Sequence, residues 1–469
     1  MTQKSDTSEN YRDQLATVDK EGKRVWIYPK KPSGPFYRAR TIVSLILLLI
    51  LFSGPFIKIN GQPLLLLDIL NRKFIIFSMG FWPQDFYLFV LATIALVIFI
   101  VLFTVVYGRL FCGWVCPQTI FMEMVFRKIE YWIEGDGHKQ RNLNAAPMNS
   151  RKFLKKASKH GIFYGISFLI GNTFLAYIIG IDQLKIIVTD PPSQHLAGLT
   201  AMILFSGMFY FIFAFFREQV CTLVCPYGRL QGVLLDPDSI VVAYDFKRGE
   251  PRGKLSARKE GRNFGDCIDC FQCVKVCPTG IDIRNGTQLE CVNCTACIDA
   301  CNNIMEKVKK PRGLIRYASF NGIKLGQKLR ITPRIAGYTA VLLTLVTVLV
   351  VLLLNRKMVE VTVMRTPGAL YQELEDGRLA NLYNLKVLNK SLQEKPIHLT
   401  LQAPSGSIEL VGEDLLIPPG EIRESAFFVK LPRSELKTIS TTVVIDVYCG
   451  EELLDQKKTS FIGPNTYKK

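Results

Sequence analysis

The chain has 469 residues, of which 49% are hydrophobic, and its formal net charge is +18. A soluble chain of this length usually divides into two or three domains with polar stretches between them, whereas here the apolar residues are gathered into blocks. The charge alone would suit nucleic acid, but no basic domain is interleaved with aromatic residues, so we exclude nucleic acid as a partner.

Five apolar blocks lack Lys, Arg, Asp and Glu, and each has 17 to 22 residues. This is close to the ~20 residues that a helix needs to cross a bilayer, so the blocks predict five transmembrane helices. They are residues 41–57, 86–107, 161–181, 196–216 and 335–354. A further block, 63–82, is interrupted by Asp68, Asn71, Arg72 and Lys73, which favours an interfacial re-entry over a span. No cleavable signal peptide is visible in the polar and basic first 40 residues.

Lys and Arg are distributed unevenly around these blocks. Residues 1–40 hold nine, 108–160 hold ten and 217–334 hold twenty, whereas 58–85 hold three and 182–195 hold one. By the positive-inside rule, the basic segments lie in the cytoplasm and the C-terminus lies outside. The expected organisation is a basic N-terminal segment (1–40), a membrane hairpin (41–107), a cytoplasmic loop (108–160), a second hairpin (161–216), a cytoplasmic segment (217–334), a fifth helix (335–354) and an external domain (355–469).

Each hairpin ends in C-x3-C-P, first as CGWVCPQ and then as CTLVCPYG. Thiols at i and i+4 share a helix face, with Cβ atoms about 5–6 Å apart, and the proline would end or kink the helix just past the second thiol. Matching positions indicate a diverged tandem repeat that would bring the four thiols together at the membrane edge. The cysteines are Cys112, Cys116, Cys221 and Cys225, and the prolines are Pro117 and Pro226.

Four thiols suit Cu(I), and they would equally suit a further iron–sulfur cluster. Spacing does not separate these two alternatives, and a purely structural role of small buried residues is the third. Duplication beside a ferredoxin module favours a functional role. Met122 and Met124 follow the first motif and could add thioether ligands, although packing is the more usual role of Met after a span.

The segments CIDCFQCVKVCP (267–278) and CVNCTACIDAC (291–301) both have the spacing C-x2-C-x2-C-x3-C. This spacing is typical of bacterial ferredoxins with two 4Fe–4S clusters, in which the fourth cysteine of each run reaches the other cluster. The first predicted cluster-binding set is Cys267, Cys270, Cys273 and Cys301, and the second is Cys291, Cys294, Cys297 and Cys277. Two zinc sites would also use eight thiols, but zinc sites rarely have three cysteines at this spacing. Asn302 stands where the first run has Pro278, which would loosen one loop without removing a ligand.

Twelve of the thirteen cysteines fall in the predicted cytoplasmic segments. Thiols stay reduced there, so metal binding or redox work is the default expectation, and electron transfer follows from two clusters in one domain. The four histidines, His138, His160, His195 and His398, offer no pair for a membrane haem. The sequence has no C-x-x-C-H, Walker or G-x-G-x-x-G motif, so we set aside c-type haem, ATP and NAD.

Residues 358–469 alternate in hydrophobicity and are rich in β-branched residues, with turn signals such as PSG and PPG. Segments such as VEVTVMR, PIHLTLQ and TTVVIDVY predict strands, and the whole predicts an immunoglobulin-like β-sandwich. Cys449 has no partner on this side, so we expect it to be a small buried hydrophobic residue. The domain is best interpreted as a docking module without chemistry of its own.

Nearly the full length of the sequence resembles the FixG/CcoG (RdxA) family of cytochrome oxidase accessory proteins. The segments that carry this resemblance are VWIYPKKPSGPFYRAR (25–40), GPFIKINGQPLLLLDILNRKFIIF (54–77), both C-x3-C-P motifs, CPTGIDIRNGTQLECVNCTACIDAC (277–301) and PRGLIRYAS (311–319). The resemblance implies a multi-pass protein of the bacterial inner membrane with a cytoplasmic 4Fe–4S ferredoxin-like α+β domain and a periplasmic immunoglobulin-like domain.

The resemblance also implies reduction of Cu(II) to Cu(I) for assembly of a cbb3-type oxidase, and thus a metal reductase activity. Cys112, Cys116, Cys221 and Cys225 would be the copper-side residues, and the ferredoxin cysteines would hold the electron supply. The implied partners are cbb3-type oxidase subunits or copper-delivery proteins, with the membrane lipid around the spans. Two other functions stay open, namely a quinol-linked membrane electron carrier and a non-catalytic assembly scaffold.

Overall fold

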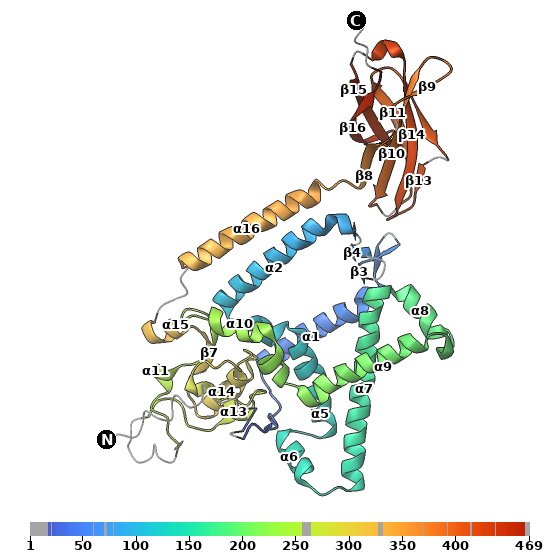
Figure 1. Cartoon of the computed structure of the whole chain (residues 1–469). Helices are drawn as coiled ribbons and strands as arrows, with labels where there is room; N and C mark the ends of the chain where they lie inside the picture. The colour runs from blue at the N-terminus through green and yellow to red at the C-terminus, as the bar shows by residue number, and fades with distance from the viewer. Residues whose placement is uncertain are drawn as a thin grey trace. The chain divides into compact units, whose positions relative to one another are not determined.

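Figure 1 shows the computed structural model of the chain, whose helices and strands are described for most of its length. The described residues are 17–19, 21–59, 61–69, 73–77, 79–255, 264–326, 332–368, 370–391, 393–412, 415–436 and 438–464. The chain forms two compact units. Unit 1 comprises Met1–Gly54, Leu91–Ala176 and Asp182–Thr347, and unit 2 comprises Pro55–Val90, Tyr177–Ile181 and Val348–Lys469.

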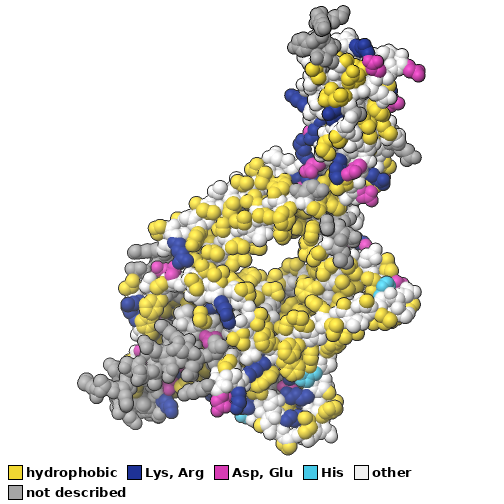
Figure 2. All heavy atoms as spheres, viewed as in Figure 1, with side chains coloured by type: hydrophobic (Ala, Val, Ile, Leu, Met, Phe, Trp, Pro, Cys, Tyr) yellow, Lys and Arg dark blue, Asp and Glu magenta, His cyan; other side chains and the backbone are white. Residues whose placement is uncertain are grey.

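Within the described residues, five helices are long and apolar enough to cross a membrane. They are α1 (Pro35–Ser53), α2 (Phe86–Tyr107), α7 (Ser150–Ile179), α9 (Leu196–Phe211), which continues as the π-helix η5 (Ile212–Phe216), and α16 (Pro333–Leu354). These helices confirm the prediction of a membrane protein with several apolar helices. In Figure 2, hydrophobic side chains cover most of the visible face of α2, α9 and α16, as expected for helices that contact lipid.

Helix α7 begins at Ser150, well before the apolar block that starts at residue 161. The side-chain oxygen of Asn149 accepts a hydrogen bond from the backbone N–H of Lys152 at 2.8 Å and thereby caps the helix start. The following Lys, Ala and Phe residues include no helix breaker, so the basic segment and the apolar block form a single helix.

The interrupted block 63–82 does not form a spanning helix but a small antiparallel sheet. Strand β4 (Lys73–Ile76) pairs with β3 (Leu65–Asp68) on one side and with β5 (Met79–Phe81) on the other. Ile75 is fully buried, and the charged pair Asp68 and Lys73 stands at the turn end of the ladder.

The ferredoxin-like domain lies in unit 1 and is built around one two-stranded ladder. Strand β6 (Val241–Tyr244) pairs antiparallel with β7 (Ile315–Ala318), and the cysteine-bearing loops lie between them in the sequence. Helix α14 (Ala296–Lys307) packs on the ladder, with Ile298 and Met305 in the buried core. The domain thus combines helices and strands, in agreement with the prediction of an α+β ferredoxin-like fold.

The other short elements of unit 1 connect these parts. They are α3 (Leu110–Trp114), α4 (Pro117–Thr119), the π-helix η3 (Ile120–Phe126), α5 (Arg127–Ile133), α6 (Gly137–Ala145), α8 (Ile181–Thr189), η4 (Pro192–Gln194), the π-helix η6 (Val220–Val224), α10 (Pro226–Leu234), α11 (Phe246–Gly249), α13 (Gln272–Lys275), η7 (Ile283–Asn285) and α15 (Phe320–Leu325). Unit 2 adds η1 (Gly54–Phe56), β1 (Lys58–Ile59), β2 (Gln62–Pro63), η2 (Pro83–Asp85) and η8 (Arg433–Glu435).

The C-terminal part of unit 2 is a β-sandwich of two antiparallel sheets. One sheet has the order β12-β14-β10-β8, with β9 also on β10, and the other has the order β13-β11-β15-β16. The strands are β8 (Val359–Arg365), β9 (Gln372–Glu373), β10 (Leu379–Asn389), β11 (Lys395–Ala403), β12 (Ser407–Val411), β13 (Leu415–Ile417), β14 (Ile422–Leu431), β15 (Ser440–Cys449) and β16 (Glu452–Ile462).

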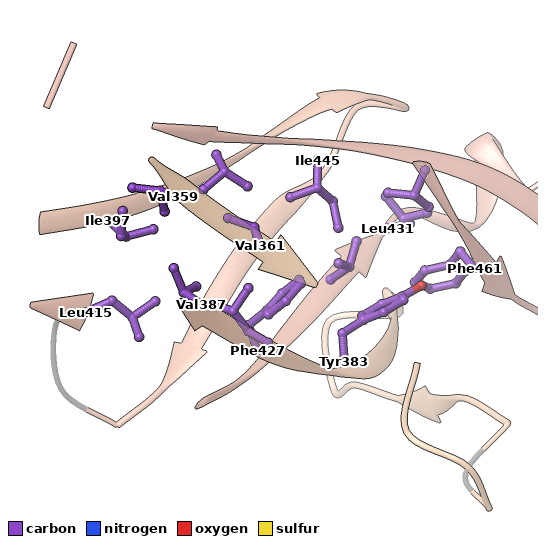
Figure 3. Packing of buried hydrophobic residues seen from close by; sticks show 14 of the residues in the cluster. Val359, Val361, Tyr383, Val387, Ile397, Leu415, Phe427, Leu431, Ile445 and Phe461 are labelled. Atoms are coloured by element: carbon purple, nitrogen blue, oxygen red, sulfur yellow. The ribbon is translucent and has the colours of Figure 1, made fainter. Parts of the chain in front are cut away.

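Side chains from both sheets fill the sandwich core (Figure 3). Val361, Val387 and Phe427 come from the first sheet, and Ile397 and Ile445 come from the second. This interdigitation confirms the predicted immunoglobulin-like sandwich. Cys449 lies at the end of β15 and packs against this core as predicted for a small hydrophobic residue, but it is only partly buried.

Candidate redox and metal centre

The first set of ferredoxin cysteines, Cys267, Cys270, Cys273 and Cys301, lines one enclosed cavity of about 350 Å³. Two backbone turns shape its loop, because Asp269 and Phe271 have φ values of 53° and 56°. These left-handed conformations flank Cys270 and let the chain wrap closely around the cavity. The fourth thiol comes from α14, which the ladder of β6 and β7 supports.

The second set, Cys277, Cys291, Cys294 and Cys297, lines another cavity of about 350 Å³, and Cys273 borders both cavities. The loop of this set has the same pair of left-handed residues, since Asn293 and Thr295 have φ values of 52° and 63° and flank Cys294. The Thr279 hydroxyl lies 3.3 Å from the Cys277 sulfur. The structure therefore brings together the two sets of four thiols that the spacing predicts, side by side.

Burial raises the pKa of six of these thiols, namely Cys273, Cys277, Cys291, Cys294, Cys297 and Cys301. It raises the pKa of Cys273, Cys291 and Cys301 to about 12 and that of Cys294 to about 11. Because a thiolate is the metal ligand, loading these cavities must displace protons, and a bound metal must stabilise the thiolates that burial disfavours.

The donor set of each cavity fits a 4Fe–4S cluster, because four thiols from two separate segments of the chain surround a largely apolar space. Within the described residues, no three His, Cys, Asp or Glu side chains converge closely enough to hold a single metal ion. A cluster places its ligands at the corners of a cube and needs no such convergence on one point.

The C-x3-C-P motifs differ from the predicted arrangement, because each helix breaks before its second thiol. Helix α3 ends at Trp114, and Cys116 has an extended conformation with ψ 123° before Pro117 starts α4. In the second motif, Cys225 has ψ 113° before Pro226 starts α10. Proline disfavours helical ψ in the residue that precedes it and suits the first position of a helix. The two thiols of a motif therefore do not share one continuous helix face, contrary to our expectation.

The four motif thiols, Cys112, Cys116, Cys221 and Cys225, nevertheless gather in one place, which we call the thiol site. Burial raises the pKa of Cys112 to about 11, and the nearby Cys116 and Cys225 raise it further. Burial likewise raises the pKa of Cys221 to about 12, with contributions from the other three thiols. The fully buried Gln231 on α10 donates a hydrogen bond from its Nε2 to the Cys112 sulfur, at 3.2 Å.

The thiol site lies against the loop of the second set. A Cβ added to Gly113 would lie 2.5 Å from the backbone oxygen of Asn293, so α3 and this loop touch through their backbones. Arg40 of α1 donates one hydrogen bond to the Gly113 carbonyl at 2.9 Å and another to the Cys294 carbonyl at 2.8 Å. Arg109 likewise donates to the carbonyls of Leu289 and, at 3.0 Å, of Gly228 just after the second motif.

A cavity of about 340 Å³ lies between the thiol site and the second set, lined by Cys221, Met122, Thr279 and Val292 among others. Met122 is buried and faces this cavity, whereas Met124 lines a separate cavity beside Cys294. Both methionines thus lie near predicted ligands, and the buried core contact of Met122 with Phe121 and Phe126 accounts for its packing role.

A buried charge network surrounds this cavity and was not identified from the sequence. Arg217 donates two hydrogen bonds to Glu130, at 3.0 and 2.9 Å, and Lys159 lies 3.6 Å from the same carboxylate. Burial tends to raise the pKa of Glu130, but the three cations Arg217, Lys159 and Arg127 hold it below its ordinary value. In the sequence, the Lys and Arg residues next to the apolar blocks indicated only the membrane topology. Their position beside a span was the one signal that could have pointed to this network.

Three family models match the chain. A 4Fe–4S binding domain matches residues 89–135, a 4Fe–4S dicluster domain matches residues 216–320, and the immunoglobulin-like fold found at the C-terminus of FixG matches residues 349–464. The first two matches include all twelve cysteines of the thiol site and the two sets.

Two curated proteins are similar to the chain over most of its length. The nitrogen fixation protein FixG of Rhizobium meliloti is 31% identical, over 88% of this chain and 87% of its own. Protein RdxA of Cereibacter sphaeroides is 34% identical, over 82% of this chain and 83% of its own. The crystal structure of a FixG-related protein from Vibrio parahaemolyticus matches 23% of this chain and 97% of its own, at 21% identity and a TM-score of 0.20, which is too low to establish a shared fold.

Proposed function

Because the chain belongs to the FixG/RdxA family and is a membrane-associated 4Fe–4S electron-transfer protein, we propose that it reduces Cu(II) to Cu(I) at the thiol site. The Cu(I) product would serve the copper site of a cbb3-type oxidase during assembly. The observation that carries this proposal is that four partly buried thiols neighbour one another against the loop of the second cysteine set, and they would have to close around the copper ion when it binds.

Copper is the substrate in this proposal, and the thiols favour its reduced form. Each electron delivered converts one Cu(II) into one Cu(I), and soft sulfur ligands bind Cu(I) in preference to harder cations. When bound in the two cysteine sets, 4Fe–4S clusters would supply the electrons one at a time.

Residues of this chain would hold the thiol site at a fixed position relative to the second cysteine set, which supplies the electrons. Arg40 ties the Gly113 carbonyl of the first motif to the Cys294 carbonyl of the second set. Gln231 fixes the Cys112 sulfur from α10.

A second candidate is that the thiol site holds a further iron–sulfur cluster. The match of residues 89–135 to a 4Fe–4S binding domain, which contains Cys112 and Cys116, favours it. Iron content separates the two candidates, since two clusters contain about eight iron atoms per chain and three contain about twelve.

The test is stopped-flow reoxidation of the anaerobically reduced full chain by Cu(II), with a Cu(I)-specific chelator to report the product. We expect Cu(II) to restore the visible iron–sulfur absorbance, and Cys112→Ser or Cys225→Ser to slow this at least tenfold without loss of iron. Cys449→Ser, outside all three thiol groups, is the matched control.

Loss of about four iron atoms per chain in the motif variants would show that the thiol site holds a further iron–sulfur cluster and not copper. Reoxidation by a quinone, with a copper reaction that is slow and indifferent to Cys112, would establish the quinol-linked carrier. If neither Cu(II) nor the quinone reoxidises the clusters, the remaining interpretation is a non-catalytic assembly scaffold.

A further inference from the structure

A large cavity near the start of α1 has no part in the proposed copper chemistry. It encloses about 730 Å³ between the beginning of α1 and helix α5, and it opens to the outside of unit 1. Its lining residues are Lys31, Tyr37, Arg38, Thr41, Ile42, Lys128, Tyr131 and Trp132. This volume is in the range of small-molecule sites in proteins, about 300–1,000 Å³.

The lining is strongly cationic. Lys31, Arg38 and Lys128 contribute to it, and none of the described lining residues is Asp or Glu. Three acids lie close to these lining residues, and each already has another partner. Asp136 accepts a hydrogen bond from the backbone N–H of Lys31 at 2.6 Å, and Asp299 accepts one from the backbone N–H of Tyr37 at 2.8 Å. Glu123 lies 3.1 Å from the Arg127 guanidinium. Lys128 donates to the Thr41 hydroxyl at 3.1 Å, and its Nζ lies 5.5 Å from the centre of the Tyr37 ring. Such a cavity is complementary to an anion.

The apolar surroundings place this anion site at membrane level. Ile42 lines the cavity, and Leu45, Ile46 and Leu49 continue from it along one face of α1 at i+3, i+4 and i+7. All four side chains are more than half exposed, so the stripe is open to lipid. Trp132 is 80% exposed at the rim, and Trp and Tyr are enriched at the membrane–water interface.

We propose that this cavity binds the phosphate of an anionic phospholipid, with an acyl chain along the Ile42–Leu49 face of α1. A basic pocket beside a transmembrane helix is the usual recognition site for acidic lipid headgroups. A zwitterionic lipid would bring its own cation next to three others, so net negative charge on the lipid decides the selectivity.

The segment that lines this cavity also contacts the ferredoxin-like domain, so a bound lipid would affect that contact. The backbone N–H of Tyr37 donates to Asp299 on α14 at 2.8 Å, and the backbone N–H of Lys30 donates to the Lys275 carbonyl at 2.8 Å. The Tyr131 hydroxyl donates to the Pro29 carbonyl at 3.2 Å. A headgroup that binds Lys31 and Tyr37 would therefore stabilise the contacts of the first turn of α1 with α14 and of the preceding segment with α13.

The test is lipid binding to the purified, delipidated full chain in a neutral detergent, counted by native mass spectrometry. The probes are phosphatidylglycerol, phosphatidylcholine and inorganic phosphate. Each surface cation adds roughly a fivefold preference for an anionic lipid, so Lys31→Ala, Arg38→Ala and Lys128→Ala together should weaken phosphatidylglycerol binding about 100-fold. The control triple variant, Arg151→Ala, Lys247→Ala and Lys324→Ala, replaces exposed or half-exposed cations outside the cavity and should retain binding.

A single Lys128→Gln variant guards against misfolding of the triple variant, since it keeps two cations and should weaken binding roughly fivefold. Equal binding of phosphatidylcholine, or equal losses in the cavity and control variants, would overturn the proposal. Competition by inorganic phosphate at the same concentration as the lipid would make the ligand a free anion. Competition by a neutral quinone would show that charge does not select the ligand.

Discussion

Gly113 lies where the first C-x3-C-P motif meets the loop of the second cysteine set. A Cβ at this position would lie 2.5 Å from the Asn293 oxygen and 2.7 Å from the Val292 oxygen, and both are backbone atoms that side-chain rotation cannot move. Gly113→Ala should therefore separate α3 from this loop and destabilise unit 1 by about 1–3 kcal/mol. The measurement is the loss of iron–sulfur absorbance on heating.

Gly165→Ala is the matched control for this substitution, because a Cβ on Gly165 would meet no atom within 4 Å. If Gly113→Ala melts at the temperature of the control, the close approach of α3 to the loop contributes nothing to stability.

Asp85 makes a buried ion pair with Lys390 and Arg356 in unit 2. Lys390 Nζ lies 2.6 Å from one carboxylate oxygen, and Arg356 lies 2.5 Å from the other. Burial acts to raise the pKa of Asp85, but hydrogen bonds from the two cations outweigh it, so the pKa is lowered. The folded chain then keeps this carboxylate ionised at a pH where the unfolded chain would protonate it. The stabilisation is complete above the ordinary pKa of Asp and is lost as pH falls through the lowered value.

We expect the melting temperature of the full chain's sandwich unit to fall as the pH drops below about 4 and through the lowered pKa of Asp85, where the folded carboxylate is protonated. Asp85→Asn should lower stability at pH 7 by about 3–5 kcal/mol, because the buried Arg356 loses its carboxylate partner and Lys390 keeps only Glu360, and should flatten this part of the pH dependence. Calorimetry of the variant beside Glu375→Gln, an exposed control, tests this. An unchanged pH profile in Asp85→Asn would assign the acid sensitivity to other groups.

The cysteines were predictable from spacing, whereas the residues that hold the thiol site in place were not. Ferredoxin spacing is a local pattern, and it named both cysteine sets before any contact was known. Gln231 contacts Cys112 across 119 positions of the sequence, and Arg109 contacts Leu289 across 180. Neither residue has a local signal, because its partner is chosen by tertiary packing.

At the scale of elements, helix type and helix breaks follow different rules. The apolar blocks predicted long helices because composition alone decides burial in lipid. The break before Cys116 and before Cys225 required attention to the residue that precedes proline, which avoids helical ψ. The i and i+4 rule assumes an unbroken helix, and this assumption made the predicted thiol arrangement wrong.

The ion pair of Glu130 with Arg217 joins α5 to the end of the fourth apolar block, residues 196–216. Both side chains are almost fully buried, and two hydrogen bonds connect them. Glu130→Gln should destabilise unit 1 by about 3–5 kcal/mol, because the Arg217 charge would remain buried with a weaker partner. The double variant Glu130→Met with Arg217→Met should recover most of this loss, since it removes both charges. A double-mutant cycle of melting temperatures measures the coupling, and additive losses would show that the pair does not act as a unit.

For the whole molecule, the kinds of domain were accessible from the sequence, but the order of the redox groups was not. Hydropathy, cysteine spacing and strand alternation are each properties of one stretch of chain. They predicted the apolar helices, the ferredoxin-like domain and the sandwich, respectively. The order depends on which loop α3 touches. Gly113 and Arg40 contact the loop of the second set, and Cys273 borders both cavities, so the second set lies between the first set and the thiol site.

This order predicts unequal effects of removing one ligand from each set. Cys270→Ala affects the first set and Cys294→Ala affects the second, and each should lower the iron content by up to half. In Cys270→Ala the second set still adjoins the thiol site, so the reduced protein should reduce Cu(II) at close to the wild-type rate with fewer electrons. In Cys294→Ala the remaining set is separated from the thiol site by the damaged one, and the rate should fall at least 100-fold. Electron paramagnetic resonance identifies the surviving cluster in each variant independently of copper, and equal rates in the two variants would mean that electrons reach the thiol site without passing the second set.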